Sequence, residues 1–106
     1  MIRIIKEIWV KRAEGEPKDW EQLPIVPATA TLKVKTTQEK AGQLKTYNLS
    51  ATLKREIPII SKNLRVFILY DDGHEVFGTQ DLPVRFETER ENRLTISAKY
   101  KTKGNS

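Results

Sequence analysis

The sequence predicts an all-β protein, a small antiparallel sandwich or partly open barrel of six to seven strands. In four segments apolar and polar residues alternate with a period of two, which is typical of strands with one buried and one solvated face. A fifth segment is a short, continuous apolar run, as expected of a central strand. No segment shows the spacing of a long amphipathic helix. The 106 residues fit a single β domain, residues 1–106.

The alternating pattern indicates both where the strands lie and which side chains they bury. The predicted strands are residues 2–10, 28–35, 46–54, 64–70, 75–79, 84–88 and 93–101. The residues that the alternation places on buried faces are Ile2, Ile4, Ile8, Val10, Ala28, Ala30, Leu32, Val34, Tyr47, Leu49, Ala51, Leu53, Val84, Phe86, Leu94, Ile96, Ala98 and Tyr100.

Four other segments read as connections or ends. Residues 13–27 contain three prolines and predict an ordered loop wrapped on the body of the domain. Residues 36–46 join two alternating strands and contain Gly42, so they predict a longer, mobile hairpin loop. Residues 55–63 predict either an irregular crossover or one short helical turn. Residues 102–106 are expected to form a flexible tail.

The segment from residue 64 to residue 79 predicts a hairpin. The continuous run over residues 66–70 suits a strand covered on both faces. Asp72 and Gly73 follow it, and an Asp-Gly pair adopts the positive φ angles of a type I′ turn. Gly78 in the returning strand predicts a bulge or a close backbone approach. Pro83 breaks that strand, because proline cannot donate to a sheet.

The same hairpin carries the densest group of acids in the chain, with His74 among them. The spacing fails the calcium-loop pattern, which needs a glycine at the sixth position and a glutamate at the twelfth. A zinc site would use several His or Cys ligands, and the chain has one His and no Cys. No nucleotide-binding or nucleophile motif occurs either. We therefore expect a solvated turn, with no catalytic residue, no metal ligand and no cofactor.

Charge is distributed unevenly along the chain, which carries a net charge of +5. From Asp71 to Glu91 seven acids and two arginines give −5, whereas the segment from Arg93 to Lys103 has four basic residues and no acid. The outward positions of two strands carry Lys33, Lys35, Lys99 and Lys101. These four lysines are the candidate contacts to nucleic acid, as in basic β-barrels that bind single strands. The alternative is that they confer solubility and block edge pairing.

A second candidate surface is apolar. Ile5 and Trp9 fall on the odd, nominally solvated positions of the first strand, and an exposed apolar patch often marks a protein contact. The alternative is that the loop bearing Trp20 folds over this patch. An acidic hairpin and basic strands on one chain could also pair head to tail between copies, and a heterologous contact of that kind builds rings or filaments.

The stretch ILYDDGHEVFGTQDLPVRF resembles an element of small β-rich structural proteins of tailed phages and prophages. In that element a strand ends in an Asp-Gly turn and returns to a G-T/S-x-x-x-P-x-R segment, which here is matched by Asp72, Gly73, Gly78, Thr79, Pro83 and Arg85. The similarity covers about a fifth of the chain. It implies a virion or prophage component without an active site, which works through copies of itself and its neighbours.

The location expected from the sequence is cytoplasmic, or the virion if the chain derives from a phage. The N-terminal segment has charges at Arg3, Lys6 and Glu7, which interrupt the apolar run that a signal peptide needs. No apolar stretch is long enough for a membrane span. The function expected is a non-enzymatic structural or protein-interaction module that contacts a protein partner or itself. The alternative is a basic β-barrel that binds nucleic acid.

Overall fold

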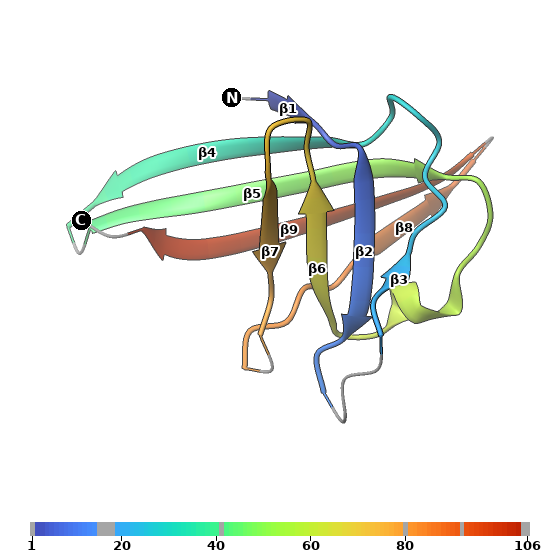
Figure 1. Ribbon diagram of the computed structural model, residues 1–106. Coiled ribbons are helices and arrows are strands. Elements are labelled where there is room, and N and C mark those ends of the chain that lie inside the picture. The colour runs from blue at the N-terminus through green and yellow to red at the C-terminus, as the bar shows by residue number, and fades with distance from the viewer. Residues whose placement is uncertain (1, 15–18, 41, 80, 92, 105–106) are drawn as a thin grey trace.

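The computed structural model describes residues 2–14, 19–40, 42–79, 81–91 and 93–104. Residues 102–104 are described by their backbone alone. Two antiparallel sheets pack face to face (Figure 1). The five-stranded sheet has the order β1 (Ile2–Ile4), β4 (Thr31–Glu39), β5 (Gly42–Leu53), β9 (Leu94–Gly104), β8 (Glu87–Arg90). The four-stranded sheet has the order β3 (Glu21–Gln22), β2 (Glu7–Arg12), β6 (Leu64–Leu69), β7 (His74–Phe77). A 3-10 helix, η1 (Pro58–Ser61), follows β5.

The predicted all-β sandwich is confirmed, and the sheets do not close into a barrel. Within the described ranges there are nine strands rather than six or seven. The first predicted strand is two strands, β1 and β2, and the two-residue β3 lies inside the predicted loop. The strands of the smaller sheet run crosswise to the long strands β4, β5 and β9 (Figure 1).

The chain passes from one sheet to the other between Ile5 and Lys6. The amide of Ile5 donates to the Ala30 carbonyl beside β4 at 2.9 Å, and the next amide, of Lys6, donates to the Leu69 carbonyl of β6 at 2.8 Å. This bend shifts the alternation by one residue, because each sheet presents its own face to the core. The predicted burial of Ile2 and Ile4 is therefore wrong, since their exposed fractions are 63% and 68%.

The same shift places Ile5 in the core, with 2% of its surface exposed. The expectation that Ile5 is exposed is wrong for this reason. Ile8 and Val10 follow the bend and are buried as predicted.

The core lies between the two sheets and contains most of the apolar residues that the alternation selected. Val34, Tyr47, Phe86, Leu94 and Tyr100 are partly buried against it. Ala28 is an exception, because it lies in the turn before β4 with a φ of 66° and is exposed. The predicted residues found buried are Ile8, Val10, Ala30, Leu32, Leu49, Ala51, Leu53, Val84, Ile96 and Ala98.

Three long strands extend beyond the smaller sheet (Figure 1). β4, β5 and β9 have 9, 12 and 11 residues, whereas β2 and β6 have six each. In the predicted mobile loop over residues 36–46, residues 36–39 and 42–46 are instead paired strand, with Glu39 opposite Gly42, and residue 41 lies outside the described part of the chain. Residues 102–104, expected in a flexible tail, pair with β5 as far as Gly104 opposite Gln43. Residues 105–106 lie outside the described part of the chain.

The β6–β7 hairpin closes without the type I′ turn that the Asp-Gly pair predicts. Tyr70 donates its amide to the Gly73 carbonyl at 2.8 Å, and no residue from Asp71 to His74 has a positive φ. The predicted close approach at Gly78 is confirmed. Its φ is +92°, and a Cβ there would lie 2.8 Å from the Leu64 carbonyl oxygen.

We expect Gly78→Ala to destabilise the fold by about 1–3 kcal/mol, because it adds backbone strain and a steric clash. The matched control is Gly73→Ala, whose Cβ would meet nothing within 4 Å, and which should change stability by less than ~0.5 kcal/mol. Urea unfolding of both variants measures the difference. Equal stabilities would contradict the close approach at Gly78.

A second pair of variants tests the bend between the sheets. Ile5→Ala should cost about 2–5 kcal/mol of unfolding free energy, because it leaves a cavity in the core. Ile4→Ala should cost less than ~1 kcal/mol, because the side chain of Ile4 is in solvent. Chemical unfolding is again the measurement, and a larger loss for Ile4 than for Ile5 would show that the alternation continues through the bend.

Candidate functional site

The outer face of the five-stranded sheet brings the four candidate lysines together. The strand register sets Lys33 opposite Asn48 and Asn48 opposite Lys99. The next row on this face sets Lys35 opposite Thr46 and Thr46 opposite Lys101. Residues paired across a sheet share a face, so all four lysines project from one side, about 10 Å apart across the strands and ~7 Å apart along them. We call Lys33, Lys35, Lys99 and Lys101 the basic face.

The lysines of the basic face are exposed, whereas Thr46 between them is 8% exposed. Long lysine side chains cover the sheet with their aliphatic stems while their ammonium groups stay in water. The hydroxyl group of Thr46 and the amide group of Asn48 on β5 therefore form a floor, with the lysines of β4 on one side and the lysines of β9 on the other. Such a floor offers hydrogen bonds and positive charge, with no nucleophile or paired acid and base.

A shallow hollow of about 540 Å³ lies at one end of the basic face. Lys33, Lys99 and Arg85 line it together with Asn48, and Glu87 is the one carboxylate in the lining. The local charge is thus positive, and the hollow is open to solvent across the strands. A flat or extended anionic surface suits it better than a small enclosed substrate does.

The two edges of this face differ in chemistry. At the β1 edge, exposed Ile2 pairs with Lys33 and exposed Ile4 pairs with Thr31. At the opposite edge, Glu87 pairs with Ser97 on β9.

Glu89, the next acid along the β8 edge, pairs with Thr95, and β8 is exposed throughout. The charge on this face therefore changes sign along the strands. The lysines lie toward the end where β4, β5 and β9 extend beyond the smaller sheet, and the glutamates lie toward the other end. The two isoleucines form an apolar strip beside both.

The acids of the β6–β7 hairpin are held by the chain itself. Arg3 on β1 forms an ion pair with Asp72 and lies 3.9 Å from Glu75. The ammonium group of Lys6 lies 3.1 Å from the Asp71 carboxylate. No group of three or more metal-ligating side chains occurs in the ranges that the structure describes. This hairpin is thus an ion-paired turn that fastens the smaller sheet to the N-terminal strand.

Tyr70 lies beneath this ion-paired turn. Its ring is buried, and the guanidinium of Arg3 lies 4.0 Å from the ring centroid. Burial raises the pKa of Tyr70 to about 12; the Glu75 carboxylate adds to the effect and Arg3 opposes it. The hydroxyl forms no hydrogen bond of good geometry with the residues described, and its interaction with the Glu75 carboxylate is electrostatic.

The apolar pair expected from the sequence is not brought together. Ile5 points into the core, whereas Trp9 lies half-buried on the outer face of the smaller sheet, opposite Phe67. The ring of Trp20 lies 6.0 Å from Phe67, and His74 stacks on the same ring at 5.2 Å. The loop bearing Trp20 therefore folds over this face, as the alternative interpretation of the sequence held.

Comparison of the chain with models of known protein families, with curated proteins and with solved structures finds no match. In the described residues no helix is long and apolar enough to cross a membrane.

The ionisation of Tyr70 predicts how stability depends on pH. Its folded pKa of about 12 exceeds the ordinary value of 10.0, so the folded state holds the phenolic proton more tightly than the unfolded chain does. This contribution to stability is present below pH 10 and is lost as the pH rises through 12. Tyr70→Phe should remove that loss and change stability at neutral pH by less than about 1 kcal/mol. Urea unfolding from pH 9 to 12 compares the two chains, and identical pH slopes would contradict the assignment.

Proposed function

We propose that the chain is a non-enzymatic structural module that associates with a second copy of itself through the outer face of the five-stranded sheet. The observation that carries the proposal is that this face is complementary to itself in both charge and polarity. An apolar strip, a basic end and an acidic end lie on one exposed surface. A contact between two identical faces needs each of these to meet its complement.

A twofold axis in the plane of the face provides that match. We place it across the strands, between the row that contains Ile4 and Glu87 and the row that contains Ile2 and Lys99. The rotation reverses the strand direction, so it exchanges the two rows. Ile2 of one copy then faces Ile4 of the other. Lys99 on β9 faces Ser97 on β9 of the other copy, and Glu87 on the neighbouring strand β8 lies about 5 Å to the side, within reach of a lysine side chain.

The rows one step farther from the axis follow the same rule. Lys101 of one copy faces Thr95 of the other, and Glu89 on the neighbouring strand β8 lies about 5 Å to the side in the same row, so that Lys101 reaches it diagonally. The register of β8, β9 and β1 in the sheet fixes both relations. The apolar strip would supply the desolvated part of the contact and the charges its polar rim, as in ordinary protein interfaces.

The interface proposed here differs from the head-to-tail pairing expected from the sequence. That pairing needs the acids of the hairpin, and Asp71 and Asp72 are engaged by Lys6 and Arg3 of the same chain. Glu87 and Glu89 take their place, and the resulting contact is isologous rather than open-ended. The resemblance of residues 68–86 to phage structural proteins supports a structural role that works through contact between copies.

The proposal predicts that charge reversals abolish and restore association. Lys99→Glu/Lys101→Glu and Glu87→Lys/Glu89→Lys should each weaken self-association roughly tenfold or more, since like charges then face each other. A mixture of the two variants should associate, because one face is now acidic and the other basic. Light scattering after size exclusion, over a concentration series, measures the molar mass of each sample.

The matched control reverses two charges elsewhere, with Arg12→Glu/Lys62→Glu, and should behave as the unmodified chain. High salt should lower the association of the unmodified chain. A monomer at every concentration and salt, or a mixture that stays monomeric while the unmodified chain associates, would overturn the proposed contact.

The second candidate is binding of single-stranded nucleic acid on the same basic face. Two rows of lysines above hydroxyl and amide groups favour it, because these groups contact phosphates. Binding of a labelled oligothymidylate should then fall steeply with added salt. Lys99→Glu/Lys101→Glu should weaken it and Glu87→Lys/Glu89→Lys should strengthen it, whereas self-association predicts a loss in both. No binding at low salt would remove this candidate.

A further inference from the structure

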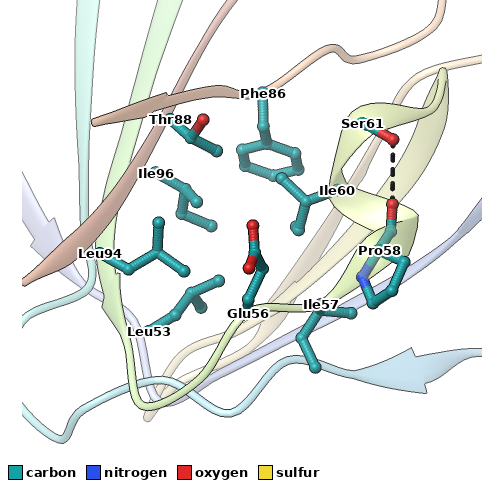
Figure 2. A pocket seen from close by; sticks show the side chains of 10 residues that line it. All are labelled: Leu53, Glu56, Ile57, Pro58, Ile60, Ser61, Phe86, Thr88, Leu94 and Ile96. Carbon is teal, nitrogen blue, oxygen red and sulfur yellow. Dashed lines mark hydrogen bonds between the residues drawn. The ribbon is translucent and has the colours of Figure 1, made fainter. Parts of the chain in front are cut away.

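An apolar chamber opens on the inner face of the five-stranded sheet, at the end away from the projecting ribbon. It lies between η1 and the strands β8 and β9 and has a volume of about 610 Å³, within the range of small-molecule sites (Figure 2). Its lining is mixed, since the polar residues Glu56, Ser61 and Thr88 stand beside the apolar side chains of Leu53, Ile57, Pro58, Ile60, Phe86, Leu94 and Ile96.

A second hollow of about 590 Å³ adjoins the chamber and forms its mouth. The two share Leu53, Glu56 and Leu94 in their linings. The mouth is rich in cations, and all of them are exposed. Its basic residues are Lys54, Arg55, Arg90 and Arg93, and its acids are Glu56 and Glu91. Four positive charges against two negative ones leave an excess of two, beside an apolar space.

Glu56 stands at the boundary between these two spaces. Figure 2 draws its side chain among the residues that line the chamber, and 72% of that side chain is exposed to solvent. Arg90 on β8 binds the Glu56 carboxylate at 3.0 Å. This ion pair neutralises Glu56 and occupies Arg90. The mouth then retains three cations, Lys54, Arg55 and Arg93, against one acid, Glu91.

We propose that the chamber and its mouth bind a single-chain anionic amphiphile, such as a medium-chain fatty acid. The hydrocarbon tail fills the chamber between η1 and β8, and the carboxylate meets Lys54, Arg55 and Arg93 in the mouth. Each part alone is weak, since an apolar groove lacks orientation and exposed cations bind small anions poorly. Joined, they specify a ligand with one apolar and one anionic end. This site is independent of the outer face and of the function proposed for it.

Isothermal titration with sodium octanoate, decanoate and dodecanoate, each below its micelle concentration, tests the chamber. Each added methylene should tighten binding about fourfold until the chamber is full. Dodecyltrimethylammonium, which has the same tail and the opposite charge, should bind at least roughly tenfold more weakly than dodecanoate. Equal affinities for the two head groups, or no dependence on chain length, would overturn the proposal.

Three sets of variants test the mouth. Lys54→Glu/Arg93→Glu should weaken dodecanoate binding roughly tenfold or more, and Lys54→Gln/Arg93→Gln should weaken it less, which keeps the test open if the first variant misfolds. Glu56→Gln should strengthen binding severalfold, because it removes a negative charge and frees Arg90. Lys62→Glu, outside both hollows, is the control and should leave the affinity unchanged.

Two results with these variants would contradict the site. One is an unchanged affinity when Lys54 and Arg93 are altered in a folded chain. The other is weaker binding of dodecanoate by Glu56→Gln, which would make the carboxylate a ligand group rather than a competitor. In that case a cationic amphiphile would be the better occupant of the chamber.

Discussion

Two consecutive amide hydrogen bonds hold this sandwich together at its N-terminal corner. Ile5 is bonded to the larger sheet and Lys6 to the smaller one, so the chain passes from one layer to the other within a single residue step. The bend fixes which side chains of β1 and β2 face the core. It buries Ile5 and exposes Ile2 and Ile4, and it directs Arg3 inward toward Tyr70 and the acids of the β6–β7 hairpin. The core, the ion-paired turn and the apolar strip on the outer face all depend on this one change of sheet.

The unequal size of the two layers determines where the chain can act. A twelve-residue strand such as β5 spans about 40 Å, whereas the four strands of the smaller sheet run crosswise to β5, lie about 5 Å apart and together reach along only about half of that length. The smaller sheet therefore covers only part of the larger one. In the part of the chain that the structure describes, no layer covers the outer face of the larger sheet, and η1 lies over one end of its inner face. The basic face lies on the first of these surfaces and the apolar chamber on the second.

The alternation of residues predicted most of the fold and part of the candidate site. It identified β4, β5 and β9 and their buried residues, and it placed Lys33, Lys35, Lys99 and Lys101 on solvated positions that the register unites. It failed at Ile2, Ile4 and Ile5, because a period of two carries no mark of a chain that changes sheets between residues. It also failed at residues 36–39 and 42–46, which form the projecting ends of β4 and β5, because mostly polar side chains on both faces of a strand resemble the composition of a loop. The acids Glu87 and Glu89 could not be assigned to the lysine-bearing face, because only the pairing of β8 with β9 places them there.

The most direct test of the account is a dilution series followed by the amide resonances of the isotope-labelled, unmodified chain. Association through the outer face predicts that the concentration-dependent shifts gather at Ile2, Ile4, Glu87, Ser97 and Lys99, which lie in the two rows beside the proposed axis. The resonances of the hairpin from Asp71 to Glu75, and those of Trp9 on the outer face of the smaller sheet, should not shift. Shifts centred on that hairpin or on Trp9, or unchanged resonances in these two rows while light scattering shows the molar mass falling on dilution, would contradict the claim that the outer face is the contact surface.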